Sequence, residues 1–256
     1  MSDQDRSIPA CLVICGPTGA GKTTLVRRLA EGLDLMAISA DSRQIYREFD
    51  IGTAKPTTAE QAITPHACLD LIPPTARYTA YAWATEAVRA ANAAVEAGRV
   101  PLVVGGAGFY VRALVHPVTE SAPDGAERYR AHYLLIDPGP VLARRIAERA
   151  RTMVETGWVE EVEALRQRIP ERAPAWQACG YRAIRSYVEG RLTLDAALTQ
   201  VTISTRQYAK RQRTWFRHQL PNDRVTRLNP DDPDAVEQAR RWVTAHQPPP
   251  TRHAST

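Results

Sequence analysis

Lysine is scarce in this sequence, because only Lys22, Lys55 and Lys210 occur among 33 basic residues. A lysine that persists against this bias is expected where a compact point charge is needed. Long apolar runs are also missing, since none approaches the roughly 18 residues of a membrane span. The first five residues have neither the basic start nor the apolar stretch of a secretory signal. We therefore expect a cytoplasmic protein with no membrane partner.

Cysteine is equally sparse, and the four cysteines show no Cys-x-x-Cys spacing. Cys11, Cys15, Cys68 and Cys179 are therefore interpreted as small core residues and not as metal or redox sites. The contents of 44% hydrophobic and 24% charged residues are close to globular averages, which argues against disorder except at the two ends. A net charge of +5 is compatible with a nucleic-acid partner without requiring one.

Apolar strand patterns alternate with helical patterns along the first half of the chain. Strands are expected over 11–15, 35–39, 68–72 and 101–104, and helices over 23–31 and 78–96. A further strand is expected over 131–136, followed by helices over 141–155, 159–167, 179–189 and 194–219. This order predicts an α/β fold with a mostly parallel, P-loop-type sheet, helices on both of its faces, and a helical C-terminal part.

A phosphate-binding loop joins the first expected strand to the first expected helix. Its residues fit the pattern G-x-x-x-x-G-K-S/T and are Gly16, Pro17, Thr18, Gly19, Ala20, Gly21, Lys22 and Thr23. Backbone N–H groups of such a loop converge on phosphate oxygens, Lys22 adds a charge, and Thr23 can bind Mg²⁺. The pattern indicates a diphosphate or triphosphate ligand without identifying it as ATP.

An acidic residue for the metal and the attacking water of a nucleotide hydrolase is not evident. Such enzymes carry it at the end of an apolar strand, but the strand expected over 101–104 is followed by Gly105 and Gly106. The segment Leu69-Asp70-Leu71 is only a partial substitute. A nucleotide kinase or hydrolase therefore remains an alternative interpretation.

Asp41 directly follows the second expected strand. Strand carboxyl ends in an open parallel sheet line the crevice where ligands bind, so Asp41 should share a cavity with the phosphate-binding loop. It could also cap a helix that begins near Ser42, and this role would not exclude a catalytic one.

These motifs together resemble the tRNA dimethylallyltransferases, also called the IPP transferase family. The matching segments are Gly16–Thr23, Asp41–Gln44, Asp50–Pro56, Pro65–His66 with Asp70, Val103–Tyr110, Gly157–Val162, Gly180–Arg182 and Thr205–Gln212 with Trp215. They keep the order and spacing of the family over roughly residues 10 to 118 and 140 to 220. The combination is highly specific.

The resemblance implies transfer of a dimethylallyl group from dimethylallyl diphosphate to N6 of the tRNA adenosine on the 3′ side of the anticodon. Asp41 would be the general base, and Asp41, Ser42, Arg43 and Gln44 would contact the target adenosine. Mg²⁺, Lys22, Thr23 and an arginine would stabilise the departing diphosphate. Arg206 is the candidate for that arginine, and Arg211 is a second diphosphate-binding candidate.

A basic stripe is expected on the helix over 194–219. Arg206, Lys210, Arg213 and Arg217 follow one another at spacings of three or four residues and therefore share one face. Such a stripe can be ordinary solvated surface. In a basic chain with a phosphate-binding loop, we interpret Lys210, Arg213 and Arg217 as RNA contacts.

Two departures from the family pattern concern RNA binding. Relatives carry a helical insertion after the segment that matches Tyr110–Leu114, whereas here a short loop-like stretch intervenes. The second departure is Ala107, which stands where the family usually has threonine, at a position that the resemblance implies to be next to the target nucleotide. The expected divisions are a P-loop core over 8–118, a remnant of the insertion over 119–135, a returning strand and helical region over 136–246, and a disordered tail over 247–256.

Three functions stay open at this point. The first is a compact tRNA prenyltransferase acting as a monomer, and the second is a prenyltransferase of free adenine nucleotides, which would need no grip on RNA. The third is a P-loop nucleotide kinase.

Overall fold

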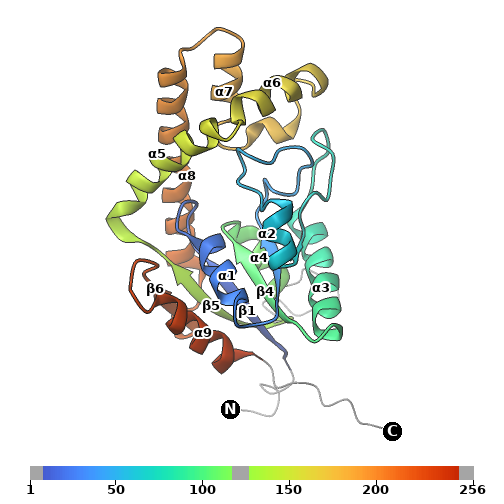
Figure 1. Cartoon of the computed structure of the whole chain (residues 1–256). Helices are drawn as coiled ribbons and strands as arrows, with labels where there is room; N and C mark the ends of the chain where they lie inside the picture. The colour runs from blue at the N-terminus through green and yellow to red at the C-terminus, as the bar shows by residue number, and fades with distance from the viewer. Residues whose placement is uncertain (1–7, 117–126, 248–256) are drawn as a thin grey trace.

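The protein is built around a parallel sheet of six strands (Figure 1), seen in a computed structural model that describes residues 8–116 and 127–247. The strands are β1 (Ala10–Cys15), β2 (Leu35–Ala40), β3 (His66–Ala67), β4 (Val100–Gly105), β5 (Arg130–Ile136) and β6 (Val225–Leu228). Their order across the sheet is β3-β2-β4-β1-β5-β6, and every pair is parallel. The predicted α/β fold is confirmed.

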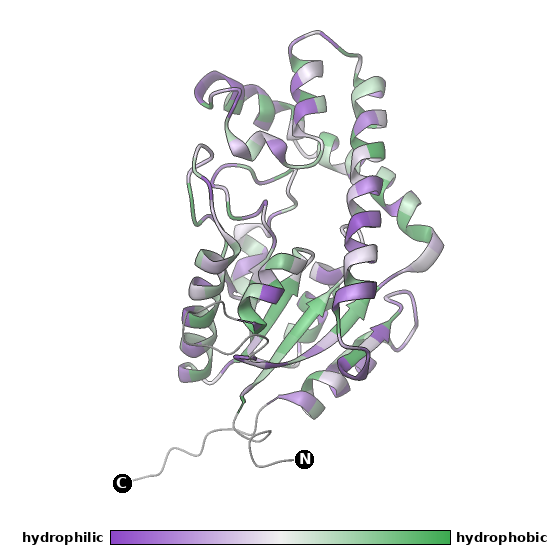
Figure 2. Cartoon of the chain, turned by 180° about the vertical axis from the view of Figure 1, so that it is seen from behind, coloured by the Kyte–Doolittle hydropathy of each residue, from purple (hydrophilic) through white to green (hydrophobic). Residues whose placement is uncertain are grey.

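Helices cover both faces of the sheet because side chains along each strand alternate between the faces. Leu12 and Ile14 of β1 pack with α1 (Lys22–Ala30) and α9 (Ala235–His246) on one face. Val13 and Cys15 belong to the larger core on the other face, which includes α3 (Ala80–Glu96) and α4 (Gly108–Val115). The strands are buried from both sides, and they form the most continuously hydrophobic part of the chain in Figure 2.

The helical part consists of α5 (Leu142–Glu155), α6 (Trp158–Arg168), α7 (Tyr181–Val188) and α8 (Leu194–Gln219). In Figure 1, α5 leads away from the sheet and the long α8 returns to it, with α6 and α7 between them. Single 3-10 turns lie at Gly139–Val141, Pro174–Gln177 and Asn222–Arg224, and the short helix α2 (Thr58–Ile63) precedes β3. The predicted limits of α8 are confirmed at both ends.

The strand predicted over 68–72 is wrong. Cys68 and Asp70 have positive φ values of 63° and 54°, which a strand cannot accommodate. The segment pairs instead with the loop after β2, since the amide of Asp70 donates to Gln44 O at 3.1 Å and that of Ile72 to Ile45 O at 3.0 Å. The sheet contact that remains is β3, two residues long.

The returning strand β5 begins at Arg130, so the boundary predicted at residue 135 falls inside it. The chain leaves the described structure at His116 and resumes at Glu127, and these two points lie close together. The amide of Arg128 donates to Val115 O at 2.7 Å, and Glu127 pairs with both Arg224 nitrogens at 2.7 and 2.9 Å. Residues 119–126 of the predicted remnant and all of the predicted tail after Gln247 lie outside the described residues.

Strand β6 and helix α9 were not predicted individually. They complete the sheet edge and one helical layer beyond β5. Within the two described ranges, no helix is long and apolar enough to cross a membrane.

Candidate active site

A cavity of about 580 Å³ lies at the carboxyl end of the central strands. Its wall is formed by the loop after β1, by Asp41 and Gln44 after β2, and by Gly105 and Gly106 at the end of β4. From the phosphate-binding loop, the cavity is lined by Thr18, Gly19, Ala20, Gly21, Lys22 and Thr23. The prediction that Asp41 and the phosphate-binding loop share one cavity is therefore confirmed.

Lys22 is the partly buried cation of the phosphate-binding loop. Its ammonium donates to the carbonyl oxygens of Gly16 and Pro17, each at 2.9 Å. Burial lowers the pKa of Lys22 to about 8, the nearby Asp41 carboxylate acts in the opposite direction, and Arg149 lowers the pKa further. Gly16 contributes its carbonyl to Lys22 and is not part of the cavity wall.

Asp41 does not cap a helix, because residues 42–45 form turns. Its Oδ1 instead accepts a hydrogen bond from the amide of Arg43 at 2.8 Å, which fixes the carboxylate at the end of β2. Asp41 also acts on the Lys22 and Arg149 cations, since its charge counteracts the burial that lowers the pKa of each. One carboxylate and two cations therefore belong to the same electrostatic environment.

Two arginines of α5 complete the cationic wall, and the sequence interpretation missed both. Arg145 and Arg149 are four residues apart on one helix face and line the cavity. Burial lowers the pKa of Arg149 from its ordinary value. Arg145 forms an ion pair with Asp231 from the turn before α9. The signal available in the sequence was a pair of arginines spaced four residues apart on the helix that follows β5.

Gln212 of α8 is a further missed residue of this site. It is 6% exposed, and its side-chain amide joins two strand ends. Its Oε1 accepts from the amide of Thr18 at 2.8 Å, and its Nε2 donates to Gly106 O at 3.0 Å. A Cβ atom at Gly106 would come within 2.1 Å of this Nε2, so the position has no room for a side chain. Gln212 thereby fixes the phosphate-binding loop against β4.

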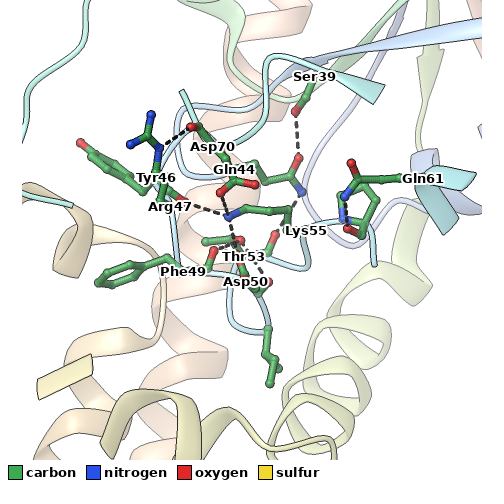
Figure 3. A network of polar contacts seen from close by, with 12 residues as sticks. Ser39, Gln44, Tyr46, Arg47, Phe49, Asp50, Thr53, Lys55, Gln61 and Asp70 are labelled. Atoms are coloured by element: carbon green, nitrogen blue, oxygen red, sulfur yellow. Dashed lines mark hydrogen bonds and ion pairs between the residues drawn. The ribbon is translucent and has the colours of Figure 1, made fainter. Parts of the chain in front are cut away.

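The loop between Asp41 and Pro56 is held by an internal polar network around Lys55 (Figure 3). The Lys55 side chain is 4% exposed, and its ammonium donates to Tyr46 O at 2.8 Å, to Asp70 at 2.6 Å and to Asp50. Three acceptors grouped around one point suit a compact ammonium better than a planar guanidinium. This explains why a lysine stands here in an arginine-rich chain.

Gln44 belongs to the same loop, and its amide is used within the protein. Its Oε1 accepts from the Ser39 hydroxyl at 2.8 Å, and its Nε2 donates to Thr53 O at 3.3 Å and Ala54 O at 3.0 Å (Figure 3). Gln44 also lines the cavity, and these bonds fix the position of its side chain there.

Helices α6 and α7 support the loop from the side away from the sheet. Glu161 accepts from the amides of Asp50 and Ile51 at 3.0 and 2.7 Å and from the Tyr181 hydroxyl at 2.6 Å. Burial raises the pKa of Glu161, and these three donors counteract the rise. The motifs around Gly157 and Gly180 therefore build the support of the active-site loop.

The predicted basic stripe on α8 divides into separate environments. A second cavity of about 440 Å³ lies between α5 and α8, and it is lined by Arg206, Lys210 and Arg213, none of which lines the cavity that contains Thr23. Arg213 pairs with Asp137, with Nε at 2.9 Å from Oδ2, and also donates to Gly139 O at 2.8 Å. Its guanidinium thus joins α8 to the segment after β5, and Arg217 is exposed.

The remaining predicted residues lie around the Asp41 side of the cavity. Arg43 and Arg211 both lower the pKa of Cys179, whereas burial and Asp41 raise it, so these groups are neighbours. Ser42 lies in the turn after Asp41, and the amide of Ala107 donates to Ala40 O at 3.0 Å. Neither Arg206 nor Arg211 lines the cavity with Lys22.

The residues present fit a Mg²⁺ ion that is held partly by a ligand. Among the described residues, no group of three or more His, Cys, Asp or Glu side chains is placed to hold a metal. Mg²⁺ commonly binds through one or two protein oxygens together with phosphate oxygens and water. Thr23 is exposed and lines the cavity, so its hydroxyl suits this arrangement.

Comparison with known proteins gives consistent matches over most of the chain. The family model described as IPP transferase matches residues 44–133 and 116–219. A tRNA dimethylallyltransferase from Picosynechococcus sp. is 34% identical over 295 residues, covering 91% of this chain and 98% of the relative. That alignment is longer than the 256 residues of this chain, so the relative has residues with no counterpart here.

Solved structures agree with the sequence relatives. A tRNA isopentenylpyrophosphate transferase from Staphylococcus epidermidis matches with a TM-score of 0.81 and 25% identity, covering 93% of this chain and 98% of that one. The corresponding protein from Bacillus halodurans matches with a TM-score of 0.80 and 27% identity, covering 94% and 97%.

Proposed function

Because this chain belongs to the IPP transferase family, we propose that it transfers a dimethylallyl group from dimethylallyl diphosphate to a tRNA adenosine, releasing diphosphate. The acceptor atom is N6 of the adenosine on the 3′ side of the anticodon. We further propose that the chain acts as a monomer.

The observation that carries this proposal is the single cavity shared by a phosphate-binding loop and Asp41. A donor whose diphosphate lies on residues Thr18–Thr23 would extend its reactive carbon toward the carboxyl end of β2. An acceptor amine would then lie between that carbon and the Asp41 carboxylate. The geometry supports direct transfer between two substrates bound in line.

The transfer forms one N–C bond and breaks one C–O bond. The N6 lone pair forms a bond to the first carbon of the prenyl group while the bond from that carbon to the diphosphate oxygen breaks. The N6 proton passes to Asp41, and the bonding electrons leave with the diphosphate. The amine is a poor nucleophile because its lone pair is delocalised into the ring, so a positioned base contributes about 10²–10⁴-fold.

The cations next to the phosphate-binding loop stabilise the leaving group. Lys22 and Arg149 are both influenced by Asp41 and line the cavity, so we assign the leaving-group arginine to Arg149 in place of Arg206. Mg²⁺, held by Thr23 and the donor phosphates, would neutralise part of the diphosphate charge.

A labelling experiment tests the proposed function. The protein is incubated with Mg²⁺ and radiolabelled dimethylallyl diphosphate, and either unmodified tRNA or AMP is offered as acceptor. We expect label in tRNA and none in AMP. A matched tRNA with guanosine in place of the target adenosine controls for site specificity. Label in AMP alone would replace the proposal with an adenine-nucleotide prenyltransferase.

A further inference from the structure

Phe109, in the first turn of α4, is exposed to solvent and has no role in the proposed reaction. It is 69% exposed, the most exposed large hydrophobic side chain among the described residues. Its neighbours in sequence are structural, because Gly108 is buried and Tyr110 is 6% exposed and stacks on Trp83. A single exposed hydrophobic side chain is common on protein surfaces, so a contact surface requires a second apolar group beside it.

Trp215 of α8 provides a second ring next to Phe109. The two ring centroids are 6.3 Å apart with an interplanar angle of 56°. A Cβ atom at Gly108 would come within 2.3 Å of the Trp215 ring, so the absence of a side chain at this position lets the indole lie against α4. Phe216 supports Trp215 from the side at 5.4 Å in an edge-on arrangement. We call Phe109 and Trp215 the aromatic pair.

The aromatic pair lies next to the active-site cavity. On the α4 side, Gly106, three residues before Phe109, lines the cavity. On the α8 side, Gln212, three residues before Trp215, lines it as well and donates to Gly106 O at 3.0 Å. Arg211 stands four residues before Trp215 on α8, over the Tyr208 ring at 5.8 Å. Exposed aromatic rings beside a cation form the pattern that binds single-stranded nucleic acid through stacked bases and phosphates.

We propose that the aromatic pair stacks the nucleobase next to the target adenosine while that adenosine occupies the cavity. The proposal rests on the proposed function, because it requires RNA as the acceptor. Withdrawing one base from a stacked loop exposes the faces of its neighbours, and an aromatic surface beside the cavity entrance would replace the lost stacking. Arg211 and Arg43 supply positive charge for the adjacent phosphates.

Binding of a fluorescently labelled anticodon stem-loop RNA tests the aromatic pair directly. Phe109→Ala should weaken binding by about ten-fold, within the range that stacking of one base contributes. Phe109→Tyr, which keeps a ring, should bind like the wild type. Tyr81→Ala on α3, a residue that is 51% exposed, is the matched control and should leave affinity unchanged. The Michaelis constant for the prenyl donor should not change in any of these variants.

An RNA with an abasic nucleotide beside the target adenosine identifies the stacked base. When the abasic nucleotide lies on the stacked side of the target, the wild type should lose about ten-fold in affinity. Phe109→Ala already lacks the ring, so the abasic RNA should bind to this variant as well as the intact RNA does. Equal losses in both proteins would overturn the proposal. A wild type that labels no RNA would contradict the proposed function instead, so the two failures are distinguishable.

Tryptophan fluorescence gives a second readout that needs no weakened variant. Trp83, Trp158, Trp176 and Trp242 are at most 6% exposed, so Trp215 is the half-buried tryptophan available to a base. RNA should quench the wild-type emission, and Trp215→Phe should remove the quenching while RNA still binds. Quenching that persists in Trp215→Phe would place the RNA elsewhere.

Discussion

Asp41 has two tasks in the proposed reaction, because its carboxylate fixes the turn after β2 and accepts the N6 proton. Its two oxygens allow these tasks to be tested separately. Oδ1 accepts the hydrogen bond from Arg43, so an asparagine can keep the same turn with its side-chain oxygen. We expect Asp41→Asn to lower kcat by about 10²-fold or more, because the amide cannot take the N6 proton. Donor binding should be nearly unchanged.

Single-turnover labelling of tRNA measures the chemical step in this variant, and calorimetry measures donor affinity. Asp34→Asn is the matched control, since the Asp34 side chain is 68% exposed and pairs with Arg99 away from the cavity. Wild-type turnover in Asp41→Asn would remove Asp41 from the role of base.

Lys22 should make donor binding depend on pH in the alkaline range. Its pKa is lowered to about 8 by burial, so the ammonium is present below pH 8 and is progressively lost above it. The diphosphate binds the charged form, and binding therefore requires proton uptake as the pH rises. We expect the Michaelis constant for the donor to be flat below pH 8 and to rise up to about ten-fold per pH unit above it.

Steady-state kinetics between pH 6.5 and about pH 9.5 at saturating tRNA would measure this dependence. Lys22→Arg should bind the donor less well throughout, without the step near pH 8, because a guanidinium keeps its charge. An unchanged step in Lys22→Arg would assign the titration to another group.

At the scale of elements, the loop from Asp41 to Pro56 depends on Lys55. Lys55→Met should lower the free energy of unfolding by about 2–3 kcal/mol, because it removes hydrogen bonds from a charged donor and leaves Asp50 and Asp70 without their partner. The two carboxylates are 56% and 46% exposed, so they regain water and the loss stays moderate. The rate of prenyl transfer should fall by more than the loss of folded protein explains, since the same loop carries Asp41 and Gln44.

Chemical denaturation and tRNA labelling of the same variant test both parts of this expectation. Lys210→Met removes a lysine on the exposed side of α8 and should leave stability within about 0.5 kcal/mol of the wild type. Activity retained in Lys55→Met would show that the loop does not need the network.

The sequence predicts those elements whose local pattern and tertiary environment agree. The buried strands around Val13 and Val103 and the long helix α8 were predicted because apolar spacing alone determines them. The strand over 68–72 failed because its partner is the loop around Gln44 and Ile45, a tertiary contact that no local pattern contains. Asp41 and the phosphate-binding loop follow from their place after parallel strands. Arg149 and Gln212 enter the cavity from distant helices, which only the packing of α5 and α8 reveals.

For the whole molecule, the shorter chain should reduce the electrostatic part of RNA binding. Each phosphate contact contributes about 0.7 to 0.9 to the slope of log affinity against log salt. We expect a shallower slope and weaker tRNA binding than in the Picosynechococcus relative, which has additional residues. Catalysis should persist, because Asp41 and the cations of the cavity are all present.

Within the described residues, Lys210 and Arg217 form no ion pair or side-chain hydrogen bond, whereas Arg213 is bound to Asp137. Replacing Lys210 and Arg217 with alanine should flatten the slope by up to about 2 without changing donor affinity. Arg89 and Arg99, on the α3 side, provide the matched double replacement. Salt titrations of tRNA binding compare the three proteins, and identical slopes would show that the two α8 cations are ordinary solvated surface.

The narrow junction between α4 and β5 has a consequence for how this enzyme can be remodelled. The bond from Arg128 to Val115 and the pairing of Glu127 with Arg224 hold the two ends of the intervening segment together, independently of its length. Loop-closure entropy grows only slowly with length, so an entire module could be grafted here or removed without displacing the sheet. An RNA-binding module can therefore be exchanged between α4 and β5 while the residues of the reaction cavity stay the same.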